Sequence, residues 1–181
     1  MVLPLISMAA VTGRLRSLRS NKEGSAAIEF AMIAPIFFGL LFALIETSMV
    51  FLAGQVLETG VQDGARLMYT SQNPSAADFK AAICAKVAVM MDCSKMDVDV
   101  RSYDPSVVIK PQDPIDSNGN YVSTNFVYQP SSYPSSNTVV VRAFYQWPLY
   151  VTGLGYNIAN IGRGTSSSKR LLAATSAVGP Q

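Results

Sequence analysis

The chain has 181 residues, of which 49% are hydrophobic and only 14% are charged. Soluble domains usually carry about 25% charged residues, so this composition favours a membrane-anchored protein over a freely soluble one. The net charge is +2, no basic patch is interleaved with aromatic residues, and histidine is absent. These features argue against nucleic-acid binding, and they exclude histidine-dependent catalysis and histidine-ligated metal sites.

Residues 1–24 are predicted to be a basic cytoplasmic leader. No lysine or arginine occurs between Ser25 and Phe51, whereas the leader carries four: Arg14, Arg16, Arg19 and Lys22. The apolar run 30–45, with its apolar flanks, exceeds the roughly 20 residues needed to span a bilayer. The positive-inside rule then places the N-terminus in the cytoplasm and the rest outside it. A cleaved secretory signal is the alternative, but the run is too long and lacks a small-residue cleavage site before a polar start.

Residues 25–70 are predicted to form one helix, half membrane span and half stalk. Apolar residues continue at helical spacing beyond the span. A bend is expected near Pro35, because a proline inside a helix removes a hydrogen bond and clashes with the preceding turn. Three glycines, at positions 54, 60 and 64, weaken the helix but allow another backbone to approach closely.

Residues 71–181 are predicted to form a small extracytoplasmic α+β domain with an antiparallel sheet. A turn and helix cap at 71–75 precede a helix over 76–91. The alternation at 96–100 predicts a strand whose aspartates, Asp97 and Asp99, are exposed. Segment 113–120 is interpreted as a turn, since it lacks the ligand spacing of a calcium loop. Residues 148–162 fit either a short helix or an irregular loop. Further strands are expected over 121–128, 138–147 and 169–177.

Cys84 and Cys93 are the only cysteines. The predicted topology places them outside the cytoplasm, where disulfides persist, so we expect a bridge between the end of the second helix and the following loop. Two buried free thiols are the alternative. Metal binding by two cysteines without histidine is improbable, and we predict no metal, cofactor or catalytic residue.

Two acidic residues lie near the ends of the apolar segment. Glu46 lies 21 residues after Ser25, about 32 Å along a helix, and is interpreted as a solvated charge at the far membrane interface. Glu29 lies one turn inside the run, where an ionised side chain costs up to about 2.5–3.5 kcal/mol. The positive end of the helix dipole would offset part of that cost. A cut after Gly24 would add a second partner, the α-amino group of Ser25, which is mostly protonated near neutrality.

The order of basic leader, Gly24, Glu29 and apolar helix resembles the processing signal of type IV pilins. More narrowly, the chain resembles the TadE-like pseudopilins of the tight-adherence (Flp) pilus. The stretches that carry this resemblance are 24–31 with Pro35, 45–46, 63–66, the cysteine pair, and Leu-Ala-Ala-Thr at 172–175. Glu23 departs from the pattern, because it places an acid next to Gly24 in an otherwise basic leader.

The resemblance implies a minor pilin in the bacterial inner membrane with its C-terminal domain in the periplasm. It implies cleavage between Gly24 and Ser25 by a prepilin peptidase, and a part for Glu29 in subunit association. Expected partners are that peptidase, other pilins, inner-membrane pilus assembly proteins and membrane lipid. The mature chain would be longer than a major Flp pilin, so the main filament subunit is not expected. Two alternatives remain: an uncleaved single-pass membrane protein whose extracytoplasmic domain binds a partner or ligand, and a membrane-anchored enzyme.

Overall fold

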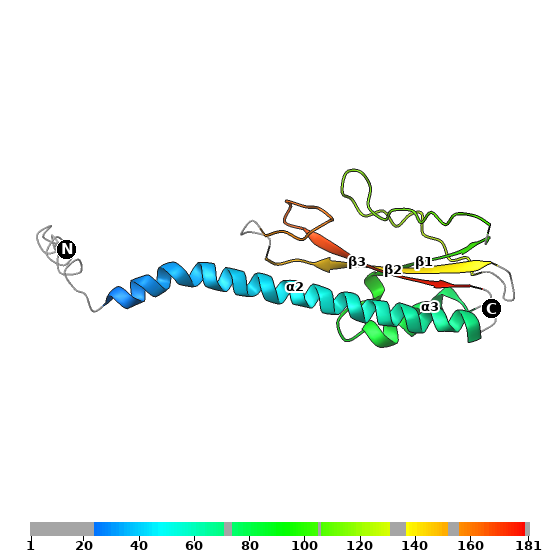
Figure 1. The fold of residues 1–181 in the computed structure, drawn as a ribbon, viewed down its shortest axis with the longest axis horizontal. Helices are drawn as coiled ribbons and strands as arrows, with labels where there is room; N and C mark the ends of the chain where they lie inside the picture. The colour runs from blue at the N-terminus through cyan, green and yellow to red at the C-terminus, as the bar shows by residue number, and fades with distance from the viewer. Residues whose placement is uncertain (1–23, 71–73, 105, 131–136, 152–155, 180–181) are drawn as a thin grey trace, which may run out of the picture. The chain divides into compact units, whose positions relative to one another are not determined.

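The computed structural model describes residues 24–70, 74–104, 106–130, 137–151 and 156–179. Residues 1–23 of the predicted leader, the turn at 71–73 and most of the loop at 129–137 lie outside these residues. The chain divides into two units, one that ends at Leu41 and one that runs from Phe42. The fold is α+β, as predicted, with a three-stranded antiparallel sheet. Its elements in chain order are helix α2 (Ser25–Thr70), helix α3 (Ala76–Val87), the short 3₁₀ helix η2 (Cys93–Lys95) and strands β1 (Met96–Tyr103), β2 (Thr138–Pro148) and β3 (Lys169–Val178) (Figure 1).

Helix α2 has the predicted bounds and continues through Pro35. It changes direction within its first, blue third (Figure 1), the part that contains this proline. From Ala43 onward every third or fourth residue is buried, which places these residues on one face of the helix. The apolar members of this buried stripe are Ala43, Val50, Ala53, Leu57, Val61, Ala65 and Met68.

Helix α3 begins at the predicted cap and ends earlier than predicted. The Ser75 hydroxyl accepts a hydrogen bond from the Asp78 N–H, and the Asp78 carboxylate accepts one from the Ser75 N–H, which closes a capping box. The helix ends at Val87 instead of residue 91. Cys84 and Cys93 are joined by a disulfide and their Cα atoms are 5.8 Å apart. A helix continued over those nine residues would separate them by about 13 Å, so the chain must turn back.

The sheet has the order β1-β2-β3, with β2 at its centre. Strand β2 is the segment with the strongest β pattern in the sequence, and β3 forms the predicted edge strand. Strand β1 is three residues longer than predicted and ends at Tyr103. In the register, Asp99 of β1 lies opposite Arg142 of β2, and Trp147 of β2 lies opposite Arg170 of β3.

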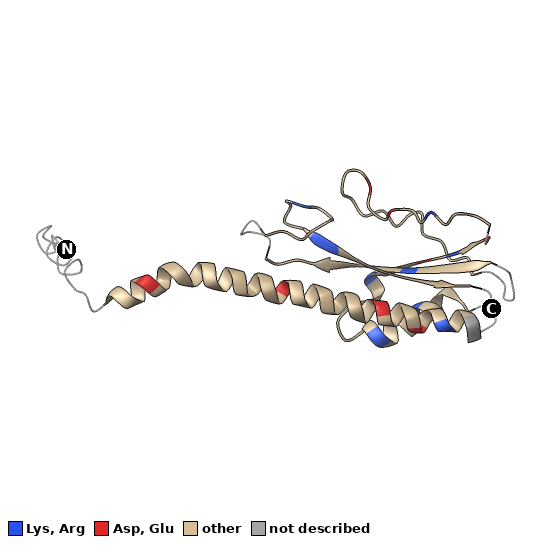
Figure 2. Ribbon diagram, viewed as in Figure 1, with Lys and Arg blue, Asp and Glu red and all other residues tan. Residues whose placement is uncertain are grey.

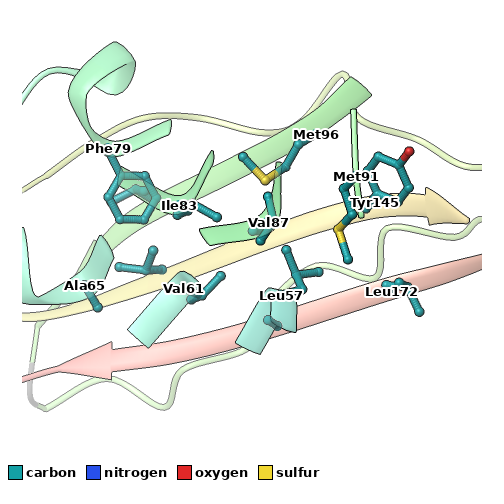
Figure 3. Packing of buried hydrophobic residues seen from close by; sticks show 14 of the residues in the cluster. Leu57, Val61, Ala65, Phe79, Ile83, Val87, Met91, Met96, Tyr145 and Leu172 are labelled. Carbon is teal, nitrogen blue, oxygen red and sulfur yellow. The ribbon is translucent and has the colours of Figure 1, made fainter. Parts of the chain in front are cut away.

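One face of the sheet packs against both helices and forms the main core. Figure 3 shows side chains of α2, α3 and all three strands meeting in one cluster. Its labelled members are Leu57, Val61, Ala65, Phe79, Ile83, Val87, Met91, Met96, Tyr145 and Leu172. The opposite face is covered by loop residues, among which Phe126 stacks on Phe144 of β2 with ring centroids 4.8 Å apart.

The prediction that Asp99 is exposed is wrong: its exposed fraction is 1%. Its Oδ2 atom accepts hydrogen bonds from Arg142 Nη2 at 2.5 Å and Nε at 3.1 Å. Its Oδ1 atom accepts from Arg101 Nε at 3.0 Å and from the Val127 N–H at 2.9 Å. The side chains of β1 do alternate between the two faces of the sheet. The face that carries Asp99 is covered by loop residues and is therefore not exposed to solvent.

The predicted strand over 121–128 is also wrong, because this segment is irregular. It makes only two isolated bridges, at Tyr121 with Ile115 and at Tyr128 with Val100. The Val127 N–H, which could have continued a ladder, donates to the Asp99 carboxylate instead. The turn interpretation of 113–120 is confirmed: Asp116 accepts from the N–H groups of Asn118 and Asn120, at 2.9 and 2.8 Å. In the segment 148–162, the described residues contain no helix.

Candidate functional site

The predicted processing site lies at the start of helix α2. Gly24 directly precedes the helix and is exposed, as are Ser25 and Glu29. A Cβ atom built at Gly24 would meet no atom within 4 Å, so the fold of the described residues does not require a glycine there. A requirement for glycine at this position would therefore have to come from outside the folded chain, as with a protease that needs access to the backbone.

Glu29 has one described partner, and that partner is the residue after the predicted cut. The Ser25 hydroxyl donates a hydrogen bond to Glu29 Oε1 at 2.8 Å, across one helical turn. Atoms of residue 25 therefore reach this carboxylate. An α-amino group at Ser25 would place a cation at the same end of the helix, where the unpaired N–H groups already favour negative charge.

The helix around Glu29 exposes large apolar side chains on all sides. Ile28 is 65% exposed, Phe30 66% and Ile33 65%, and these three positions lie on more than one side of the helix. Figure 2 shows two acidic bands and no basic residue on α2 before its last third. The helix is long and apolar enough to cross a membrane. Together with the exposure of these side chains in the described unit that ends at Leu41, this pattern fits a membrane anchor.

Glu46 is not the solvated charge that the sequence suggested, because only 8% of it is exposed. Its carboxylate accepts hydrogen bonds from the backbone N–H of Tyr150 at 2.5 Å and of Val151 at 3.1 Å. The next residue of the helix, Thr47, makes a second contact, since its hydroxyl group and that of Tyr156 hydrogen-bond to each other. Glu46 and Thr47 thus fasten the segment after β2 to helix α2. Sequence reasoning missed this contact because the two partners are about a hundred residues apart and the donors are backbone groups.

Two of the three glycines in the stalk make the close approach that the sequence predicted. A Cβ atom at Gly64 would lie 2.9 Å from Ile83 Cγ1 and 3.1 Å from the Phe79 ring, and one at Gly60 would lie 3.1 Å from Val87 Cγ1. Helix α3 therefore packs directly on the backbone of α2 at these positions. Beside them, Lys86 Nζ lies 3.2 Å from Asp63 Oδ2. A Cβ atom at the third glycine, Gly54, would touch nothing.

The disulfide between Cys84 and Cys93 closes the segment that follows α3. In the chain-entropy treatment a loop of this length is worth about 2–3 kcal/mol, a useful contribution to a domain with a small core. The bond lies far in sequence from the processing site and serves the fold. Among the described residues, no group of three or more histidine, cysteine, aspartate or glutamate side chains could hold a metal ion.

Comparison with known proteins gives a family match in the N-terminal part of the chain. The family model described as TadE-like protein matches residues 24–66, which contain Gly24, Ser25, Glu29, Glu46 and both close-contact glycines. The match confirms the resemblance to TadE-like pilins of the Tad/Flp system over this segment, and it does not extend into α3 or the sheet. No curated protein and no solved structure matches the chain.

Proposed function

We propose that this chain is a membrane-inserted minor pilin, or pseudopilin, that acts in the assembly of a Tad/Flp-type pilus and thereby in surface attachment. The observation that carries the proposal is the TadE-like match over residues 24–66. This segment combines an exposed glycine, an acid five residues later, and an apolar helix whose first turns expose large apolar side chains. The role is structural, and no catalytic activity is assigned.

Processing is the first step of the proposed function. A prepilin peptidase would cut between Gly24 and Ser25, removing the leader and leaving the helix with a new α-amino group. The open space around Gly24 supports this step, because nothing in the described chain shields the bond from an enzyme. Before the cut, the Ser25 hydroxyl is the hydrogen-bond donor to Glu29 among the described residues.

Membrane insertion follows from the same segment. The basic leader would remain on the cytoplasmic side of the inner membrane and the sheet domain would lie in the periplasm. Lipid would surround the exposed apolar side chains of α2 until assembly. The proposed partners are then the peptidase, the inner-membrane pilus assembly proteins, and other pilins that replace lipid around this helix.

Glu29 is proposed to pair with an α-amino group during subunit association. In a bilayer an ionised carboxylate is costly when unpaired, so a subunit that offers a cation at the right depth would be selected over one that does not. The amine could come from the same chain or from a neighbouring pilin.

The test is to compare Glu29→Ala with the matched control Glu58→Ala in cells that make the pilus. Glu58 is an exposed glutamate on the same helix, outside the apolar run. We expect both variants in the membrane fraction, but Glu29→Ala strongly depleted from the pilus assembly complex recovered by co-purification, and Glu58→Ala present at the unsubstituted level. Equal recovery of Glu29→Ala and the unsubstituted protein would refute the proposed part of Glu29.

A further inference from the structure

We propose that the end of the sheet domain that carries Trp147 and Tyr150 lies at the periplasmic membrane–water interface and contacts phospholipid, and that Glu46 holds it there. The surface concerned, here called the aromatic edge, consists of Trp147, Tyr150 and Val151 together with Phe42, Ile45 and Met49 of α2. The inference rests on the proposed membrane anchorage of α2.

The position of Glu46 along the helix sets the level of the aromatic edge. It lies 21 residues after Ser25, about 32 Å along an α-helix, and the hydrocarbon core of a bilayer is about 30 Å thick. Counted along the sequence, a membrane span that begins near Ser25 therefore ends near Glu46. The hydrogen bonds from the Tyr150 and Val151 N–H groups to the Glu46 carboxylate hold that segment at the same level.

The side chains at this level are the kinds that favour the boundary between lipid and water. Tyr150 is 84% exposed, and Trp147 is partly buried on the helix-facing side of the sheet, where its ring lies edge-on to Tyr145 at 6.3 Å. Tryptophan and tyrosine gather at membrane interfaces because each has an apolar ring and a polar group. Phe42, Ile45 and Met49 expose further apolar surface beside them.

An open apolar cavity marks the place where lipid would fit. It has a volume of about 420 Å³ and is lined by Phe42, Ile45, Glu46, Met49, Trp147, Tyr150 and Val151. Its one charged lining residue is Glu46, whose carboxylate already accepts two backbone hydrogen bonds. Water gains few hydrogen bonds in such a cavity, whereas the upper part of an acyl chain would cover it at no polar cost.

The geometry also explains why a carboxylate lies at this depth. A carboxylate buried away from water is costly when it lacks hydrogen-bond partners, but Glu46 is satisfied by two main-chain donors. Glu46 acts as a positioning residue. In this proposal it does not itself contact lipid, but it holds in place the segment that does.

Trp147 is the only tryptophan in the chain, so its fluorescence reports on the aromatic edge alone. The full chain would be reconstituted into phosphatidylcholine vesicles whose acyl chains are brominated either near the headgroup or near the chain ends. We expect flotation of the chain with the vesicles and loss of most Trp147 emission with the shallow bromines, with a smaller loss for the deep ones. The matched control is Trp147→Phe combined with Tyr103→Trp. Tyr103 lies opposite Thr138, nine residues along β2 from position 147 and about 30 Å away, and its emission should be retained.

Several results would overturn the inference. Equal Trp147 emission in brominated and unbrominated vesicles, with the chain still floating, would show that the aromatic edge does not contact lipid. Emission that instead depends on the ratio of protein to lipid would assign the cavity to a neighbouring copy. Stronger quenching by the deep bromines would place the edge inside the hydrocarbon. A chain that does not float would refute the membrane anchorage itself, and the inference with it.

The part of Glu46 is tested by two variants in the same vesicles. Glu46→Ala removes the acceptor and should reduce shallow quenching of Trp147, whereas Glu46→Gln keeps an acceptor oxygen and should retain most of it. Unchanged quenching in Glu46→Ala would show that Glu46 does not hold the aromatic edge at the interface.

Discussion

The two parts of helix α2 differ in what surrounds them, although they form one continuous element. From Ser25 to Leu41 the apolar side chains are exposed on nearly every side, and Glu29 has an exposed serine as its described partner. From Phe42 onward one face is buried under α3 and the sheet, and Glu46 is enclosed by main-chain donors. Under the proposed function, the first part packs against groups outside the chain, lipid or other subunits, whereas the second part is a component of the domain core.

This difference predicts that substitutions in the first part change processing and assembly without changing stability, and that substitutions in the second part do the reverse. A substitution in the first part that destabilises the fold, or one in the second part that blocks processing or assembly, would contradict this comparison.

The largest effect is expected at Gly24. Gly24→Leu should abolish removal of the leader, because a bulky side chain would obstruct the approach of a peptidase to the bond. The urea unfolding midpoint of the chain in detergent micelles should not change, since a side chain at this position meets nothing within 4 Å of its Cβ. Intact mass measures the first result and Trp147 fluorescence the second. Normal processing of Gly24→Leu would contradict the assignment of the cut site.

The next largest effect is expected at Asp99. Asp99→Asn removes the charge that Arg142 pairs with in a buried site, and removing one member of a buried pair costs about 3–5 kcal/mol. The measurement is urea unfolding in micelles followed by Trp147 fluorescence. The control is Asp104→Asn, an exposed aspartate that accepts hydrogen bonds from Ser106, for which a loss below about 1 kcal/mol is expected. Membrane insertion and leader removal should be normal in both variants, and a small loss for Asp99→Asn would show that the pair contributes little to the fold.

The smallest effects are expected at two glycines on the same helix, where the same substitution should change stability in opposite directions. Gly64→Ala should destabilise the domain by about 1–2 kcal/mol, since overpacking against Ile83 and Phe79 costs more than the gain in helix propensity. Gly54→Ala should instead stabilise it by up to about 1 kcal/mol, because its Cβ would touch nothing. The same unfolding measurement compares them, and stabilisation by both alanines would mean that α3 does not press on the α2 backbone.

Local patterns predicted the elements well. The bounds of α2 follow from the apolar run and its helical continuation, and the start of α3 follows from the Ser75 cap. The central strand follows from its β-branched and aromatic residues. The motif of Gly24 and Glu29 could be recognised because all of it lies within one turn and a half of helix.

The errors at Asp99, at Glu46 and over residues 121–128 share one cause, which is contact between distant segments. Alternation assigned Asp99 to the second face of β1 but could not show that loop residues cover that face, because its partner Arg142 lies 43 residues later. Arg142 is the one charged residue within the central strand, a signal that could have suggested a buried pair. Nothing local to Glu46 indicated that main-chain donors about a hundred residues away would enclose it.

The most direct test of the account is the N-terminus of the protein recovered from membranes of cells with an active prepilin peptidase. Intact-mass measurement should give a chain that begins at Ser25, in which Glu29 is the fifth residue. A chain that retains its leader through Gly24 in those cells would contradict the proposed processing, and with it the assignment of this protein as a pseudopilin.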